Sequence, residues 1–295
     1  MRVAFIGIGN MGTPMAGHIV RGGHDVTVYD ADPQRAAQFA SVNGGKAARS
    51  LSDLATSEFV VTMLPDGHAV RSVMFEAPDG GLAQYLQPGA VLIDMSSSDP
   101  VGTRKLGAEL KARGVVMLDA PVSGAVPRAT LATLAIMIGG DDKAVIERAR
   151  PLLSCMGNRL FETGGLGTGH AMKALNNYVA AAGFAAAAEA ILIGKRFGLD
   201  PDGMIDIINA STGRNFITEM VMKDHVIHEK FATGFALGLL AKDVRIAADL
   251  GEAVELDAPV SRLMRERWGM ARDRLGATRD HSEAIKSWDL DLLKE

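Results

Sequence analysis

Apolar positions in the first half of the chain fall into short continuous runs separated by amphipathic stretches. Such runs are typical of strands buried on both faces of a parallel sheet. They are Val3–Ile8, Val26–Tyr29, Phe59–Leu64, Val91–Ile93, Val115–Leu118 and Leu134–Ile138. Between them, segments such as Asp32–Val42 and Pro100–Arg113 have the pattern of crossover helices. This alternation predicts a doubly wound α/β domain with a parallel sheet.

The pattern changes at a glycine-rich segment, Gly164–Gly169, which we expect to break regular structure. After it, β-rich runs vanish and helical patterns continue to the end of the chain. Ala171–Phe197 is predicted as one long helix that ends before Gly198. We therefore predict an α/β domain over residues 1–162 and an all-α domain over residues 163–295.

Composition narrows the class of protein. The 295 residues are 47% hydrophobic and 22% charged, with a formal net charge of -4, so we expect a globular protein without a nucleic-acid partner. The single cysteine, Cys155, excludes an intramolecular disulfide and fits a reducing compartment, so we expect a cytoplasmic location. Polar residues interrupt the apolar stretch Ala174–Ile193. We interpret that stretch as a buried helix and expect no membrane span, which needs about 20 predominantly apolar residues.

A G-x-G-x-x-G turn follows the first predicted strand and opens a helical pattern. In this context glycines allow a tight turn and close approach of the backbone to a pyrophosphate, which the helix N-terminus also attracts. The predicted cofactor-binding residues of the turn are Gly7, Gly9, Asn10, Met11 and Gly12.

Asp30 lies 18 residues beyond Gly12, at the end of the second predicted strand. A carboxylate there accepts hydrogen bonds from the ribose hydroxyls of NAD and repels the extra phosphate of NADP. We therefore predict NAD as the preferred cofactor.

Ligands of open parallel sheets lie outside the carboxyl ends of the strands. The loops after two later strands are accordingly candidates for holding the second half of the cofactor, through Met63, Leu64, Pro65, Ser96 and Ser97.

Four motifs occur in a characteristic order along the chain. They are Phe5–Gly12 with Pro14, Met15 and Ala16; Asp119–Gly124; Gly167–Lys173 followed by Asn176 and Asn177; and Lys242 with Asp243. Together they resemble those of the β-hydroxyacid dehydrogenases, a family that includes 3-hydroxyisobutyrate dehydrogenases and tartronate semialdehyde reductases. The resemblance covers nearly the whole chain. It implies an N-terminal Rossmann domain, a helical C-terminal domain and an active site between them.

The resemblance also implies a role for each matching residue. Lys173 would be the general acid/base, and Ser123 with Gly124 would hold the carboxylate of the substrate. Asn177 and Asn176 would orient the substrate. Lys242 would lie near the nicotinamide, and Ser97 would contact the cofactor.

The spacing of the third motif supports this chemistry independently. On a helix, Lys173, Asn176 and Asn177 are spaced i, i+3 and i+4 and share one face. Hydride transfer from an alcohol requires loss of the hydroxyl proton, which a lysine with a lowered pKa in a dry cleft can take. Taken with the resemblance, which implies the substrate class, these residues lead us to expect transfer of a hydride between a nicotinamide cofactor and a small 3-hydroxy acid or the matching semialdehyde.

Three departures from the family pattern lie near the predicted substrate-binding residues, so the sequence does not identify the substrate. The family's second glycine after Gly124 is Ala125 here, its Gly-Thr-Leu begins with Ala132, and Pro127 and Arg128 add bulk and charge. An imine reductase of the same fold is one alternative, which Lys173 disfavours because such relatives usually carry another residue there. A dinucleotide-binding module without catalytic activity is the other.

His225, His228 and Glu229 lie close together, but their spacing matches no zinc-protease pattern, so we expect an exposed helix face and no metal. We expect the partners to be a small anionic substrate and further copies of the chain, in a homodimer or homotetramer.

Overall fold

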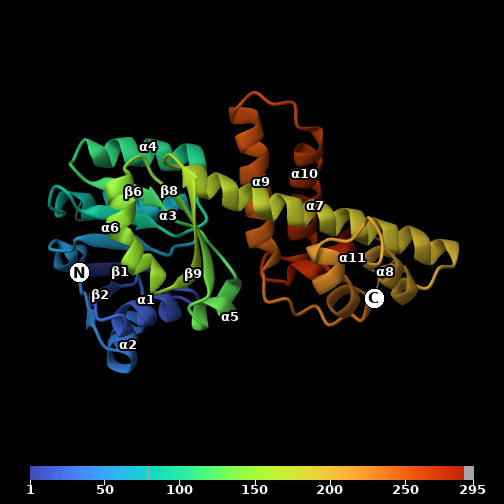
Figure 1. Cartoon of the computed structure of the whole chain (residues 1–295), viewed down its shortest axis with the longest axis horizontal. Coiled ribbons are helices and arrows are strands. Elements are labelled where there is room, and N and C mark those ends of the chain that lie inside the picture. The colour runs from blue at the N-terminus through green and yellow to red at the C-terminus, as the bar shows by residue number, and fades with distance from the viewer. Residues whose placement is uncertain (79, 289–295) are drawn as a thin grey trace. The chain divides into compact units, whose positions relative to one another are not determined.

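The computed structural model describes residues 1–78 and 80–288, which form two compact units that divide between Lys173 and Ala174. The first unit is a sheet covered by helices (Figure 1). Its strands are β1 (Arg2–Ile6), β2 (Asp25–Tyr29), β3 (Lys46–Ala47), β4 (Phe59–Thr62), β5 (Val91–Asp94), β6 (Val116–Asp119), β7 (Val122–Ser123), β8 (Leu134–Gly139) and β9 (Gly157–Gly164). All six predicted strands are present.

The strand order is β3-β2-β1-β4-β5-β6-β8-β7, with β9 paired to β8. Pairing is parallel from β3 to β6, as the apolar runs predict. The sheet departs from parallel pairing at one end, where β8 pairs antiparallel with both β6 and β7. The hydrophobic pattern gives no sign of β9, a largely exposed strand.

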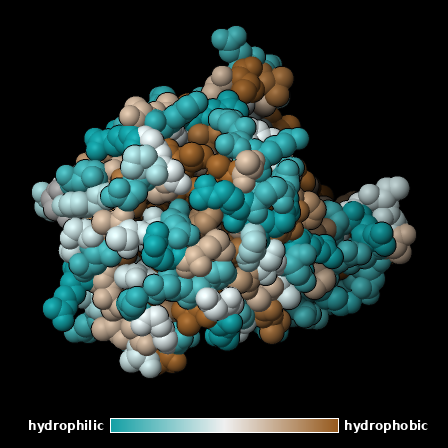
Figure 2. Space-filling view, turned by 60° about the vertical axis from the view of Figure 1, so that its left-hand side comes forward, coloured by the Kyte–Doolittle hydropathy of each residue, from teal (hydrophilic) through white to brown (hydrophobic). Residues whose placement is uncertain are grey.

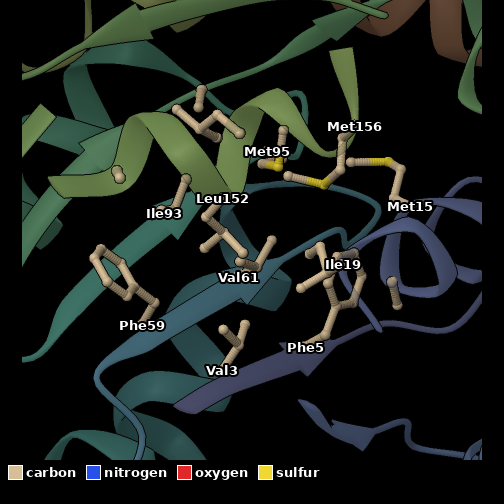
Figure 3. Packing of buried hydrophobic residues seen from close by; sticks show 14 of the residues in the cluster. Val3, Phe5, Met15, Ile19, Phe59, Val61, Ile93, Met95, Leu152 and Met156 are labelled. Atoms are coloured by element: carbon tan, nitrogen blue, oxygen red, sulfur yellow. The ribbon is translucent and has the colours of Figure 1, made fainter. Parts of the chain in front are cut away.

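Both faces of the sheet are buried under helices. Side chains of Val3, Phe5 and Val61 belong to one core cluster, and the alternate residues Ala4, Ile6 and Val60 belong to another. Figure 3 shows the first of these cores, where β1 and β4 meet residues of α1 and α6. The helices are α1 (Gly12–Arg21), α2 (Pro33–Asn43), α3 (Gly67–Arg71), α4 (Pro100–Lys111), α5 (Ala125–Thr130) and α6 (Lys143–Ser154). Those that contribute to the first core are α1, α2, α5 and α6, whereas α3 and α4 contribute to the second. The doubly wound architecture is therefore confirmed.

In the described residues of the second unit, the regular secondary structure is helical apart from one isolated β-bridge between Ala236 and Asp280. Its helices are α7 (Thr168–Phe197), which begins in the first unit, α8 (Pro201–Asn209), η4 (Thr218–Ile227), α9 (Leu237–Ala253), α10 (Pro259–Leu275), η5 (His281–Ala284) and α11 (Ile285–Trp288). Helices α9 and α10 pack side by side (Figure 1). The core contains Phe184, Trp268 and many alanine side chains.

Polar residues cover most of the face seen in Figure 2, and apolar residues gather in small patches. Among the described helices, α7 alone is long and apolar enough to cross a membrane by length and composition. However, 44% of its most apolar window is buried in the protein, and core helices of soluble proteins pass the same test.

Candidate functional site

The glycine-rich turn between β1 and α1 is shaped by close backbone contacts. A Cβ on Gly12 would lie 1.8 Å from the carbonyl oxygen of Gly7, and one on Gly7 would lie 2.3 Å from that of Met63. A Cβ on Gly9, by contrast, would meet nothing within 4 Å. The turn therefore closes tightly at two glycines and leaves open space beside the third, which fits the approach of a pyrophosphate to the backbone. Asn10 is exposed and Met11 is half-buried beside it.

The Asp30 carboxylate is fixed against this turn. Its Oδ2 accepts a hydrogen bond from the backbone N–H of Ile8 at 2.7 Å, and its Oδ1 accepts one from Asp32 at 2.9 Å. Each carboxylate oxygen retains a second lone pair. The carboxylate is thus held at the end of β2, close to where the backbone is open, and can accept hydrogen bonds from a ribose.

The two predicted cofactor loops contact each other at the carboxyl ends of β4 and β5. The backbone N–H of Leu64 donates to the hydroxyl of Ser96 at 2.9 Å. Ser96 is fully buried, so its hydroxyl holds the neighbouring loop in place, whereas Ser97 is half-buried and Pro65 is exposed. Met63 adjoins the glycine-rich turn, as the contact with Gly7 shows.

Ser123 and Gly124 lie where β7 leads into α5. Ser123 pairs with Ala135 of β8 and is half-buried. Gly124 has φ 135°, and the side chain of Arg128 lies where a Cβ would be. The two alanines that replace family glycines, Ala125 and Ala132, have φ of 52° and 55°. These departures therefore fall where the backbone is left-handed and favours glycine.

Lys173, Asn176 and Asn177 all lie on α7, at the predicted helical spacing. Lys173 is half-buried, Asn176 is exposed and Asn177 is only 8% exposed. The amide Nδ2 of Asn176 donates to Oδ1 of Asn177 at 3.2 Å, and Nδ2 of Asn177 donates to Oδ2 of Asp243 at 2.6 Å. Nζ of Lys242 lies 3.8 Å from the other oxygen of Asp243. The two asparagines that follow the third motif are thus linked to the Lys-Asp pair of the fourth motif within the helical unit.

The expected start of this helix at Ala171 is wrong by three residues, because α7 begins at Thr168 inside the glycine-rich segment. The reason is a pair of hydrogen bonds to an acceptor outside the helix. The backbone N–H groups of Gly167 and His170 each donate to the carboxylate of Asp119 at 2.7 Å.

Two buried aspartates were not among the predicted site residues. Asp94 and Asp119 end neighbouring strands β5 and β6, pair in register and are 1% and 0% exposed. Asp94 accepts hydrogen bonds from the hydroxyls of Thr62 and Ser98 and from the backbone N–H of Ser96. An aspartate closing each of two apolar runs was the available signal in the sequence.

The histidines near residue 228 have local partners. His228 Nε2 lies 3.0 Å from Oδ1 of Asp202, and the ring of His225 accepts a hydrogen bond from Ala232. Within the described part of the chain, no group of three or more His, Cys, Asp or Glu residues is arranged to hold a metal.

Family models match both halves of the chain. Residues 2–165 match the NAD-binding domain of 6-phosphogluconate dehydrogenase. Residues 167–288 match the domain described as NAD-binding of NADP-dependent 3-hydroxyisobutyrate dehydrogenase.

Characterised relatives align over nearly their full lengths. 2-(Hydroxymethyl)glutarate dehydrogenase of Eubacterium barkeri is 34% identical over 98% of this chain and 95% of its own. NAD-dependent L-serine dehydrogenase of Pseudomonas aeruginosa is 33% identical over 98% of each chain. 3-Sulfolactaldehyde reductase of Escherichia coli is 33% identical over 92% of this chain and 90% of its own.

Solved structures of the same family have a similar fold. The 3-hydroxyisobutyrate dehydrogenase of Mycobacterium tuberculosis with L-serine superimposes with a TM-score of 0.88 at 32% identity, over 97% of this chain and 98% of that one. An imine reductase of Streptomyces aurantiacus, at 20% identity and a TM-score of 0.60, shares the fold. The chain therefore belongs to the β-hydroxyacid dehydrogenase family, whose members are NAD(P)-dependent oxidoreductases that act on hydroxy acids or the matching semialdehydes.

Proposed function

We propose that this enzyme oxidises the hydroxyl of a small 3-hydroxy acid, or runs the reverse reduction of the semialdehyde, with Lys173 as general acid/base. The observation that carries the proposal is the arrangement on α7. Lys173 lies one turn before Asn177, and Asn177 is bonded to Asp243 beside Lys242. The helix thus presents one group that can exchange a proton and one amide held in a fixed orientation.

In the oxidation, neutral Lys173 accepts the hydroxyl proton of the substrate as the C–H bond breaks, and the carbonyl forms. The nicotinamide, when bound, accepts the hydride. In the reduction, protonated Lys173 returns the proton to the carbonyl oxygen. Ser123 and the backbone at Gly124 hold the anionic group of the substrate, while Asn176 and Asn177 orient the reacting carbon.

For the cofactor we propose NAD, on the strength of Asp30. Its carboxylate is held beside the open backbone of Gly9 by the Ile8 N–H, where a ribose 2′-phosphate would meet a negative charge. The residues that would hold the dinucleotide are Gly7, Gly9, Asn10, Met11, Gly12, Asp30, Met63, Leu64, Pro65, Ser97 and Lys242, with Ser96 orienting the 63–65 loop.

The substrate is proposed to be a small acid with its anionic group close to the reacting carbon. Relatives are named for 2-(hydroxymethyl)glutarate, L-serine, 3-sulfolactaldehyde and 3-hydroxyisobutyrate. All four are short skeletons with a carboxylate or sulfonate. Ala125, Pro127 and Arg128 distinguish this chain beside the proposed anion site.

We further propose a cytoplasmic homodimer or homotetramer that binds neither membrane nor nucleic acid. Apolar side chains on α7 support self-association, because Val179, Ile193 and Phe197 are 67%, 69% and 85% exposed in the single chain. Light scattering coupled to gel filtration measures the number of subunits.

The proposed function is tested by a screen for NAD reduction over serine, threonate, glycerate, 3-hydroxyisobutyrate, 4-hydroxybutyrate and a sulfonate analogue, with a parallel panel of amines. Turnover of at least one hydroxy acid, and of no amine, is expected. Turnover confined to amines would support an imine reductase instead. Tight NAD binding without turnover of any compound would support a module without catalytic activity.

A further inference from the structure

The buried carboxylate of Asp119 contacts the segment that precedes the proposed catalytic lysine. We propose that Asp119, together with His170, is a positioning residue that sets the place of Lys173 relative to the substrate-binding segment. The proposal rests on the function assigned above to Lys173. It gives a role in the reaction to two buried polar residues that contact neither substrate nor cofactor in the proposed mechanism.

The first observation is how α7 begins. Gly167 precedes the helix and has no side chain that could cap it. The capping acceptor comes instead from the end of β6, where Oδ1 of Asp119 accepts from Gly167 N–H and Oδ2 from His170 N–H, both at 2.7 Å. Short hydrogen bonds to an ionised acceptor are among the strong ones in proteins. Asp119 is 0% exposed, so water does not compete for them.

The second observation is that the surrounding glycines leave room for this contact. A Cβ on Gly139 would lie 2.3 Å from Oδ1 of Asp119, and a Cβ on Gly169 would lie 2.9 Å from Oδ2. A Cβ on Gly169 would also lie 2.4 Å from the carbonyl oxygen of Met137. Any side chain at either glycine would separate the helix start from the carboxylate. Gly169 of the third motif and Gly139 at the end of β8 therefore provide the space that the Asp119 carboxylate of the second motif needs to reach the helix start.

The third observation is the side chain of His170, three residues and about one turn before Lys173. Its Nδ1 lies 2.8 Å from the hydroxyl of Thr103 on α4, and its Nε2 lies 3.6 Å from Oδ2 of Asp94. His170 is 1% exposed. The first turn of α7 is thus held by its backbone at β6 and by a side chain between α4 and β5.

These contacts converge on the segments that carry the proposed chemistry. Asp119 is the first residue of the segment that leads to Ser123 and Gly124. Asp94 fixes Ser96, whose hydroxyl holds Leu64 of the cofactor loop. One buried cluster therefore sets the relative positions of the anion-binding segment, a cofactor loop and the helix of Lys173. Misplacement of a catalytic group by about 1 Å can cost about 100-fold in rate.

The test is Asp119→Asn, compared with Asp142→Asn. Asparagine retains one acceptor oxygen, so one of the two N–H groups, of Gly167 or of His170, loses its partner. Asp142 is the control for the change of residue type, because its exposed carboxylate also accepts two backbone N–H groups, from Ala144 and Val145 at the start of α6, but both at Oδ1. We expect Asp119→Asn to lower kcat by about 10- to 100-fold per NAD-binding molecule, with little change in NAD affinity. Asp142→Asn should retain wild-type kcat.

A double-mutant cycle with Lys173→Ala separates positioning from a general loss of structure. If Asp119 acts through Lys173, the Asp119→Asn substitution should cost almost nothing further in kcat once Lys173 is absent. A loss of the same factor in both backgrounds would overturn the proposal, as would equal kcat in the Asp119→Asn and Asp142→Asn variants. If Lys173→Ala alone keeps wild-type turnover, the acid/base assignment fails first, and the cycle shows this directly.

Thr103→Val provides a second variant if Asp119→Asn does not fold. Valine keeps the shape of threonine and removes the hydroxyl that meets His170. We expect a smaller loss of kcat than for Asp119→Asn, which again disappears in the Lys173→Ala background. Thr103→Val with wild-type kcat, or with the same loss in both backgrounds, would contradict the role of His170.

Discussion

Each unit of this enzyme has an apolar core, and each also contains a buried cluster of a different kind. In the α/β unit, Asp94, Asp119 and His170 are 1%, 0% and 1% exposed and lie where β5, β6 and α7 meet. In the helical unit, Phe184 and Trp268 are each 0% exposed, with ring centroids 5.4 Å apart. The first cluster is built from polar groups, and the second from aromatic rings.

This difference separates positioning from stability. A buried polar group costs free energy unless hydrogen bonds replace those it made to water, so the polar cluster is a costly way to fill a core. It does fix backbone atoms at defined points, as Asp119 does for α7. Buried aromatic rings contribute mainly through the apolar area that they remove from water. Substitutions in the polar cluster should therefore lower kcat, and substitutions in the aromatic cluster should lower the free energy of unfolding.

The largest expected effect on stability is at Trp268. Trp268→Ala should lower the free energy of unfolding by about 3–5 kcal/mol, because it empties a fully buried site beside Phe184 and Trp288. Trp268→Phe is the matched control and should cost less, since the indole N–H has no hydrogen-bond partner to lose among residues 1–78 and 80–288. Denaturant unfolding measures both. The folded alanine variant should bind NAD as tightly as wild type. A marked loss of NAD affinity would contradict the claim that the aromatic cluster affects stability alone.

The next effect is on substrate binding. Ser123→Ala should raise KM for the best acid substrate about 10- to 100-fold and change kcat less, because a hydrogen bond to a charged group is worth about 1.5–3 kcal/mol. Stability should change little. Ser41→Ala, at an exposed serine on α2, is the control and should leave KM alone. Steady-state kinetics decide, and an unchanged KM in Ser123→Ala would reject the anion site.

Cofactor choice should respond to Asp30. Asp30→Asn combined with Ala31→Arg should weaken NAD binding by about tenfold and shift preference towards NADP, since a repelling charge is removed and an attracting one is added. Ala31→Arg alone, with Asp30 retained, should shift the preference less. Fluorescence titration with both cofactors gives the ratio of affinities. A wild-type enzyme that already prefers NADP would show that another basic residue holds the phosphate.

The smallest effect is a pH dependence of stability in the helical unit. Burial is the main cause that lowers the pKa of His281 below its ordinary value of 6.5, so the folded state keeps this ring neutral where the unfolded state takes up a proton. The thermal midpoint should therefore fall as the pH falls from about 6.5 towards that lowered pKa. His281→Phe should flatten this dependence, because the substitution removes the buried ring that titrates. Identical pH profiles for wild type and His281→Phe would contradict the assignment.

The sequence predicted the elements whose apolar pattern is strong. The six buried strands and the change to helices after Gly164 were predicted because both produce a clear pattern of apolar positions along the chain. Strand β9 was missed because only one of its eight residues is fully buried. The antiparallel course of β8 was also missed, since strand direction depends on pairing and not on composition.

The candidate site was predictable to the extent that its residues lie within contiguous motifs. The glycines at 7 and 12 and the acid at 30 follow from local turn geometry, and Lys173 follows from the family resemblance of its motif, which the helical spacing supports. The role of Asp119 does not, because its partners Gly167 and His170 are 48 and 51 residues away in the chain. Motifs show which residues are present, and only the fold shows which of them touch.

The most direct test of the account is the pH dependence of turnover in wild type and Lys173→Ala. Oxidation by wild type should rise with pH through one ionisation, and reduction should fall through one. Lys173→Ala should bind NAD normally, lose that ionisation and turn over about 10²- to 10⁴-fold more slowly. Lys173→Arg should do little better, since guanidinium stays protonated. A folded, NAD-binding alanine variant that keeps more than about a tenth of wild-type kcat would contradict the central role of Lys173.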